Sequence, residues 1–171
     1  MIITTWNIRG LNSKGKQRYL KEKKFREHKL KEVMSNFKPH YEIIGQDAVG
    51  SVGGVAILWN LEEVQFEDWI SIPRIISGRF RNIGSQEWIL LSNVYGPHIP
   101  GEHRNFLQSL AIICSMFPAS PLIVGGDLNM ITSPNEKRGG LRRTDVDMEA
   151  FGDMIAEQRL VDIQTTNGIY T

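Results

Sequence analysis

Two polar side chains follow a buried stretch at spacing two, in the segment LIVGGDLNM. Asp127 and Asn129 come after the apolar residues 122–124 and two glycines. Asn7 closes the β-rich N-terminal stretch IITTWN, and Tyr95 closes another apolar run just before Gly-Pro. The end of a strand in a rigid sheet is a good place to hold a catalytic group. We therefore treat these four residues as site candidates.

Each candidate also has a structural interpretation. Asp and Asn favour tight turns, so Asp127 and Asn129 alone would be turn formers. Tyr95 alone would be a strand aromatic with a satisfied hydroxyl, and Asn7 alone a polar residue at a strand end. In extended backbone, however, residues two apart point to one face, so Asp127 and Asn129 could flank one reacting group.

The elements that must position these residues are strands mixed with helices. Strands are expected at 2–6, 52–59 and 122–124, with a hairpin from 77–83 to 88–95. Residues 106–117 carry a helical apolar pattern, a second helix follows a Thr144/Asp147 capping box, and 17–37 suggests two helices across a polar seam. NGIYT at the end looks like the start of a strand. The pattern predicts one α/β domain over 1–171, with sheets covered by helices.

Composition narrows the function classes. The 171 residues carry net charge +1, so a basic surface for nucleic acid must be local. Candidates for it are Lys21, Lys23, Lys24, Lys29 and Lys31, which suit a solvated helix face, and Lys137, Arg138, Arg142 and Arg143, which could meet a DNA backbone. The single cysteine, Cys114, excludes an internal disulfide and suits a small core residue. The sequence shows no signal peptide or membrane span, which predicts an intracellular protein of the cytoplasm or nucleus.

Three ordered motifs carry a family resemblance: TWNIRGLN (5–12), NVYGPH (93–98) and GGDLNM (125–130). Together they resemble the endonuclease/exonuclease/phosphatase superfamily, which cleaves phosphate esters with a divalent metal. The stretches GGVAILWN, SGRF and RRTDVDM further resemble the apurinic-type endonuclease segment of plant LINE retrotransposons. The resemblance implies a sandwich of two mixed sheets with helices on the outer faces, and a DNA partner.

The resemblance also implies roles for the candidates. Asn7 would orient a neighbouring ligand or phosphate, Tyr95 would donate to a phosphate oxygen, and Asp127 would orient or deprotonate the attacking water. Asn129 would hydrogen-bond the phosphate. The cofactor would be Mg²⁺ or Mn²⁺, with Asn7 and Asp127 as the nearest candidate ligands. Phosphodiester hydrolysis needs such a water, such donors and such a cation.

Two parts of the family pattern are expected to be missing. The first is an internal strand that ends in a Gln-Glu-Thr-Lys motif, whose glutamate binds metal. No such strand is predicted between Leu20 and Leu30, where Glu22 and Glu27 suit a solvated helix. The second is a set of closing strands with a Ser-Asp-His motif. Among His28, His40, His98 and His103, only His98 follows a motif, and it suits a turn.

These gaps predict an incomplete domain that is inactive or very weak. Three alternatives stay open: a non-catalytic nucleic-acid-binding remnant, a poorly folding gene fragment, and a phosphatase of small substrates. Salt-sensitive DNA binding without cleavage would favour the first.

Overall fold

The structure of the chain is a computed structural model. It describes residues 2–8, 38–47, 53–117, 120–136 and 145–163, with the single residues 28, 31, 32 and 36. The chain divides into two compact units, one made of Met1–Tyr95 with Phe117–Asp127 and the other of Gly96–Met116 with Leu128–Thr171. The single domain expected over 1–171 stays a prediction.

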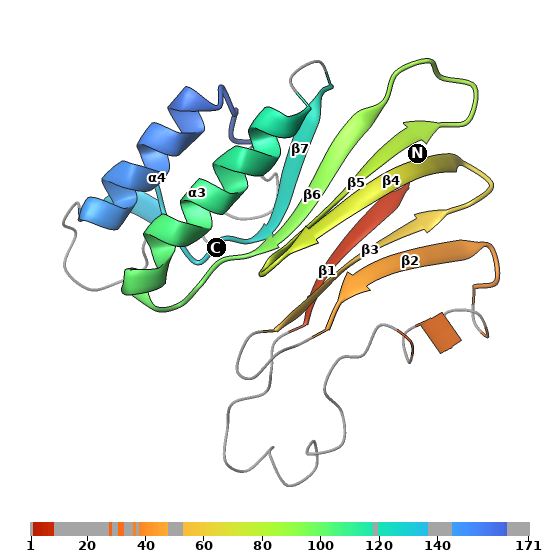
Figure 1. Ribbon diagram of the computed structural model, residues 1–171, viewed down its shortest axis with the longest axis horizontal. Coiled ribbons are helices and arrows are strands. Elements are labelled where there is room, and N and C mark those ends of the chain that lie inside the picture. Colours follow the sequence, from red (N-terminus) through yellow and green to blue (C-terminus); the bar gives the residue numbers. More distant parts are fainter. Residues whose placement is uncertain are drawn as a thin grey trace, which may run out of the picture. The chain divides into compact units, whose positions relative to one another are not determined.

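The first sheet of the first unit has three antiparallel strands in the order β1-β3-β2 (Figure 1). They are β1 (Ile3–Ile8), β2 (Tyr41–Gln46) and β3 (Gly54–Asn60). Because β1 and β2 are both antiparallel to β3, they run in the same direction, and their C-terminal ends lie at one edge of the sheet. The central strand, β3, is buried along almost its whole length.

The second sheet has four strands in the order β4-β5-β6-β7. They are β4 (Val64–Ile72), β5 (Ile75–Asn82), β6 (Ile89–Tyr95) and β7 (Leu122–Asp127). The first three form antiparallel pairs, and β7 joins β6 in parallel. This sheet is therefore mixed, whereas the first is wholly antiparallel.

One apolar core lies between the two sheets. Side chains from both sheets form it, and Trp59 stacks on Phe66 with ring centroids 4.7 Å apart. Two buried polar contacts lie in this unit: Asn93 Nδ2 donates to the Ala56 carbonyl at 2.9 Å, and the hydroxyls of Ser77 and Ser92 lie 2.7 Å apart. The predicted sandwich of two sheets is confirmed.

The second unit holds the helices α3 (Pro100–Met116) and α4 (Val146–Glu157) and a short 3₁₀ turn, η1 (Pro134–Glu136). The buried positions of α3 are spaced three and four apart, as an amphipathic helix requires. The cap of α4 is Asp145, whose side chain accepts from Met148 N, so the predicted Thr144 cap is wrong. None of the helices among the described residues is long and apolar enough to cross a membrane.

Several other sequence expectations can be compared with these elements. The strands near 2–6 and 52–59, the hairpin and both later helices are confirmed, but β2 and β4 were not predicted. Of two tryptophans whose type suggests a core position, Trp59 is buried, whereas Trp69 is 44% exposed. Of the helices expected at 17–37, only residues 28, 31, 32 and 36 are described, and these are helical and exposed. The strand expected in NGIYT lies outside the described residues.

Candidate functional site

Asn7 lies inside β1, one residue before the strand ends, rather than just after it. Its side-chain nitrogen donates to the Val94 carbonyl of β6 at 2.7 Å, which ties the two sheets together. The donor contact also fixes which way the amide points. Its oxygen, Oδ1, is buried and accepts no hydrogen bond from the described residues. A buried acceptor without a donor among the described residues is unusual in a native fold, which makes this oxygen a candidate ligand atom.

Tyr95 and Asp127 are the last residues of β6 and β7 and lie opposite each other in the parallel pair. The strand β7 therefore runs through both glycines, three residues further than predicted. Paired residues in a sheet share a face, and Tyr95 packs in the core between the sheets at 3% exposure. Asp127 lies on this inner side and is only partly buried.

Gly126 allows this pairing. A Cβ at Gly126 would lie 2.1 Å from the Val94 carbonyl oxygen and 2.9 Å from Asn93 Oδ1, and its φ of +131° lies where side chains are rarely tolerated. The second glycine of the GGD motif thus places backbone directly against β6. Because Gly126 has no side chain, β7 can approach β6 closely, and Asp127 pairs with Tyr95 at the ends of the two strands.

A polar pair that the sequence analysis missed stands at the end of β2. Gln46 is its last residue, and the exposed Asp47 follows directly. Gln46 Nε2 donates to Ser71 Oγ and to the Ile72 carbonyl, both at 2.9 Å, and Gln46 Oε1 accepts from Arg74 N at 2.9 Å. The sequence analysis did not predict this strand or the acidic residue after it, whereas residues 20–27, where the family strand was sought, lie outside the described residues. The available signal was Gln-Asp directly after the apolar Ile-Ile-Gly.

Hydrogen bonds connect these positions at one end of the sandwich. Asn7 and Gln46 lie opposite the same residue, Val55, from either side, so their backbones are about 10 Å apart and their side chains share a face. Asn7 Nδ2 donates to the Val94 carbonyl, and the backbone N–H of Tyr95, the residue after Val94, donates to the Arg74 carbonyl at 2.9 Å. The backbone N–H of Arg74 donates in turn to the side chain of Gln46. The ends of four strands meet there: β1, β2, β6 and β7.

Asn129 belongs to the second unit, and its geometry differs from the prediction. Its φ is +52°, so the backbone at Asn129 is left-handed, whereas the sequence analysis had assumed an extended one. Asn129 Nδ2 instead donates to the Gly96 carbonyl at 2.7 Å. Gly96 is as tightly packed as Gly126, because a Cβ there would lie 1.7 Å from the Leu128 carbonyl oxygen.

The residues at the strand ends of the first unit suit a magnesium-type cation. Such ions prefer oxygen ligands and are commonly held by one or two carboxylates, with water and substrate completing the shell. The carboxylates Asp47 and Asp127 and the available oxygen of Asn7 are of this kind. Within the described residues there is no group of three or more His, Cys, Asp or Glu side chains that could hold a metal.

The other sequence candidates contribute little here. His98 is exposed, and His40 pairs with Glu62 at 3.2 Å on the surface. Glu22, Glu27 and the basic set from Lys137 to Arg143 lie outside the described residues. Cys114 is partly buried, and burial raises the pKa of its thiol, which fits the predicted role as an unreactive packing residue.

Comparison with known proteins identifies the fold. No protein-family model matches the chain, and neither does any curated protein. Solved structures do match. D. rerio TDP2 complexed with single-strand DNA product has a TM-score of 0.51 at 12% identity, covering 95% of this chain and 67% of that one. An endonuclease/exonuclease/phosphatase family protein from Bacteroides thetaiotaomicron has a TM-score of 0.50 at 18% identity, covering 75% and 65%.

A third match is ANGEL2, a 2',3'-cyclic phosphatase in complex with adenosine-2',3'-vanadate, with a TM-score of 0.53 at 11% identity, covering 78% of this chain and 41% of that one. The fold is that of endonuclease/exonuclease/phosphatase proteins. In three further matched structures, the match covers 62%, 44% and 51% of the other protein's chain, so this chain spans less than two thirds of their length. At these identities the likeness concerns the fold, and function has to be argued from the residues of the site.

Proposed function

We propose that this chain is a divalent-metal-dependent phosphodiesterase domain that acts on DNA. The observation that carries the proposal is the meeting of Asn7, Gln46-Asp47 and the Tyr95–Asp127 pair at one end of the sandwich. The ends of these strands carry carboxylates, a phenol and an amide oxygen at one end of the sandwich. Phosphate-ester hydrolysis needs groups of these kinds, because it requires an activated water, hydrogen-bond donors and ligands for a cation.

Each residue has a role in this proposal. Asp47 and the amide oxygen of Asn7 hold Mg²⁺ or Mn²⁺, and Asp127 orients the attacking water and takes its proton. Tyr95 donates to a phosphate oxygen, and the family resemblance assigns Asn129 a second donor role. The bound cation supplies charge stabilisation as negative charge develops on the phosphate oxygens. Gln46 makes no contact with substrate and fixes the end of β2.

The sequence motifs support a narrower proposal, that the domain derives from a retrotransposon-type endonuclease of the apurinic class. We also propose that activity is weak rather than lost. The expectation of inactivity depended in part on a missing acidic residue, and we propose Asp47, which directly follows β2, for that role. Because the described residues hold no larger metal-binding cluster, we expect slow turnover.

A nicking assay tests the proposal. Supercoiled plasmid and a duplex with one abasic site are incubated with the protein and Mg²⁺ or Mn²⁺. We expect slow, metal-dependent nicking that favours the abasic duplex and falls by roughly 10²-fold or more in Asp127→Ala, because the water loses its base. Asp47→Asn should require more metal for the same rate, since one charged ligand is lost.

Asp153→Ala is the matched control, because Asp153 is an exposed aspartate on α4. Its nicking rate should equal that of the unchanged protein. Cooperative urea unfolding establishes that each variant is folded. The proposal is overturned if the folded protein does not nick DNA with either metal, or if Asp127→Ala and Asp47→Asn leave the nicking rate unchanged.

A further inference from the structure

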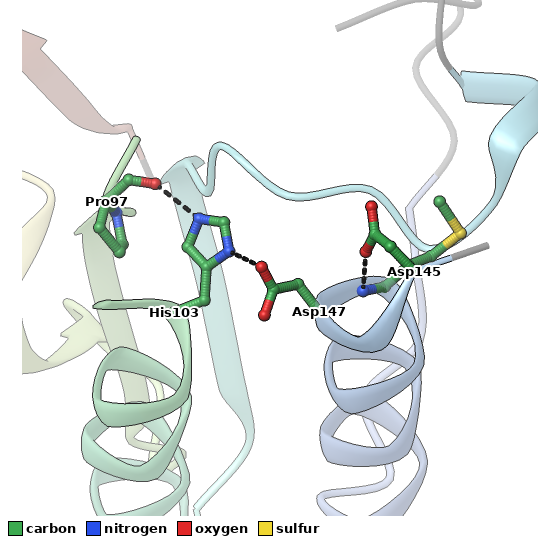
Figure 2. A network of polar contacts seen from close by, with 5 residues as sticks. Pro97, His103, Asp145 and Asp147 are labelled. Carbon is green, nitrogen blue, oxygen red and sulfur yellow. Dashed lines mark hydrogen bonds and ion pairs between the residues drawn. The ribbon is translucent and has the colours of Figure 1, made fainter. Parts of the chain in front are cut away.

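His103 is a buried histidine that the proposed reaction does not use. It lies in the first turn of α3 at 7% exposure, and both ring nitrogens have partners within the second unit. Nδ1 lies 2.8 Å from Asp147 Oδ2 at the start of α4, and Nε2 lies 3.0 Å from the Pro97 carbonyl oxygen. Figure 2 shows the ring between these two partners.

The two contacts connect the histidine ring to both ends of the second unit's polar network. A carbonyl oxygen can only accept, so Nε2 donates to Pro97. Nδ1 contacts the Asp147 carboxyl group on the other side of the ring, so the ring links the chain before α3 to the first turn of α4.

The contact with Pro97 fixes a turn, Gly96–Pro97, to which the side chain of Asn129 is also hydrogen-bonded. The Gly96 carbonyl, one residue before Pro97, accepts from Asn129 Nδ2 at 2.7 Å. His103 therefore holds one peptide carbonyl of this turn, and Asn129 binds the adjacent one. Asp147 is held in turn by the first turn of α4, which the Asp145 cap fixes.

We propose that His103 and Asp147 are positioning residues that fix the Gly96–Pro97 turn and, through it, the side-chain amide of Asn129. The inference rests on the proposed function, in which Asn129 donates to the phosphate. The pair touches no substrate in this proposal. It sets the direction of a donor, and misplacing such a group by about 1 Å can lower a rate roughly 10²-fold.

Two substitutions of His103 separate its two contacts. His103→Gln places an amide nitrogen near the position of Nε2 and can keep the bond to Pro97. His103→Asn places one near Nδ1 and can keep only the bond to Asp147. If the hold on Pro97 matters, His103→Asn should lower kcat of DNA nicking by roughly 10–100-fold, the range typical of residues that orient a ligand. KM should change little, and His103→Gln should restore most of the rate.

The control is His40→Asn, because His40 has an exposed carboxylate partner, Glu62, at 3.2 Å. A double substitution decides whether His103 acts through Asn129. Residues that act as one unit are not additive, so His103→Asn with Asn129→Ala should nick no more slowly than Asn129→Ala alone. Multiplying losses, or equal losses in His103→Asn and His103→Gln, would overturn the inference.

A measurement that needs no activity separates this inference from the proposed function. The Asn129 side-chain amide gives its own ¹⁵N–¹H NMR signals, assigned by their loss in Asn129→Ala. We expect these signals to move in His103→Asn, which loses the bond to Pro97, and to stay in place in His103→Gln and His40→Asn. If the signals move but no DNA is nicked, only the proposed function fails. If they do not move, the positioning role is refuted.

Discussion

Replacing Gly126 with alanine should be among the most destabilising single changes at the candidate site. The added Cβ would lie 2.1 Å from the Val94 carbonyl oxygen and 2.9 Å from Val94 N, both backbone atoms of the neighbouring strand. Neither can yield without shifting β6. A non-glycine residue in an unfavourable backbone region costs about 1–3 kcal/mol, and overpacking adds about 1–3 kcal/mol, so the loss in unfolding free energy is about 2–6 kcal/mol.

Urea unfolding followed by circular dichroism measures this loss, with Gly152→Ala as the control. Gly152 lies in α4, and a Cβ there meets nothing within 4 Å. The control should gain up to about 1 kcal/mol from the higher helix propensity of alanine. If Gly126→Ala unfolds at the same urea concentration as the unchanged protein, then β7 does not press against β6 as described, and the alignment of Asp127 with Tyr95 loses its support.

Two further predictions concern buried groups. Ser92→Ala should lower the unfolding free energy by about 1–3 kcal/mol, because it removes the partner that the buried Ser77 hydroxyl meets at 2.7 Å. Changing both Ser77 and Ser92 to alanine should restore most of this loss in the same urea titration. A further drop in stability in the double variant would contradict the pairing. Cys114 should react with iodoacetamide more slowly in the folded protein than in urea at neutral pH. Burial raises the pKa of the thiol and so lowers its thiolate fraction below that pKa, and equal rates would refute this.

The sequence predicted the elements whose side-chain pattern is strong. The alternating and continuous apolar runs of β3, β5 and β6 and the helical spacing in α3 and α4 each match their structure. The strand β4 was missed because its alternation of apolar and polar residues is interrupted between Phe66 and Trp69, where the register shifts. β2 was missed because six residues with two central isoleucines give too short a signal.

The candidate site was predicted only in part. The motifs identified Asn7, Tyr95 and Asp127, and the structure shows that their strands end together, while their roles stay predictions. Asn129 was placed by assuming extended backbone, but its φ is +52°, a local geometry that spacing alone does not reveal. Asp47, which is part of the proposed site, was overlooked because the acidic residue was sought between Leu20 and Leu30. The pairing of β2 with β3 sets where Asp47 lies, and no local pattern encodes that long-range pairing.

Asn7 of β1 and Gln46 of β2 both pair with Val55 of β3, so the middle strand sets the distance between these two polar residues. Val55 is fully enclosed and carries no chemistry of its own. Its side chain shares a face with Asn7 and Gln46 and lies between them, so in the proposed function a substitution there would change the surroundings of the cation without touching any group that binds it. Tuning metal preference in this scaffold could therefore start from an apolar position.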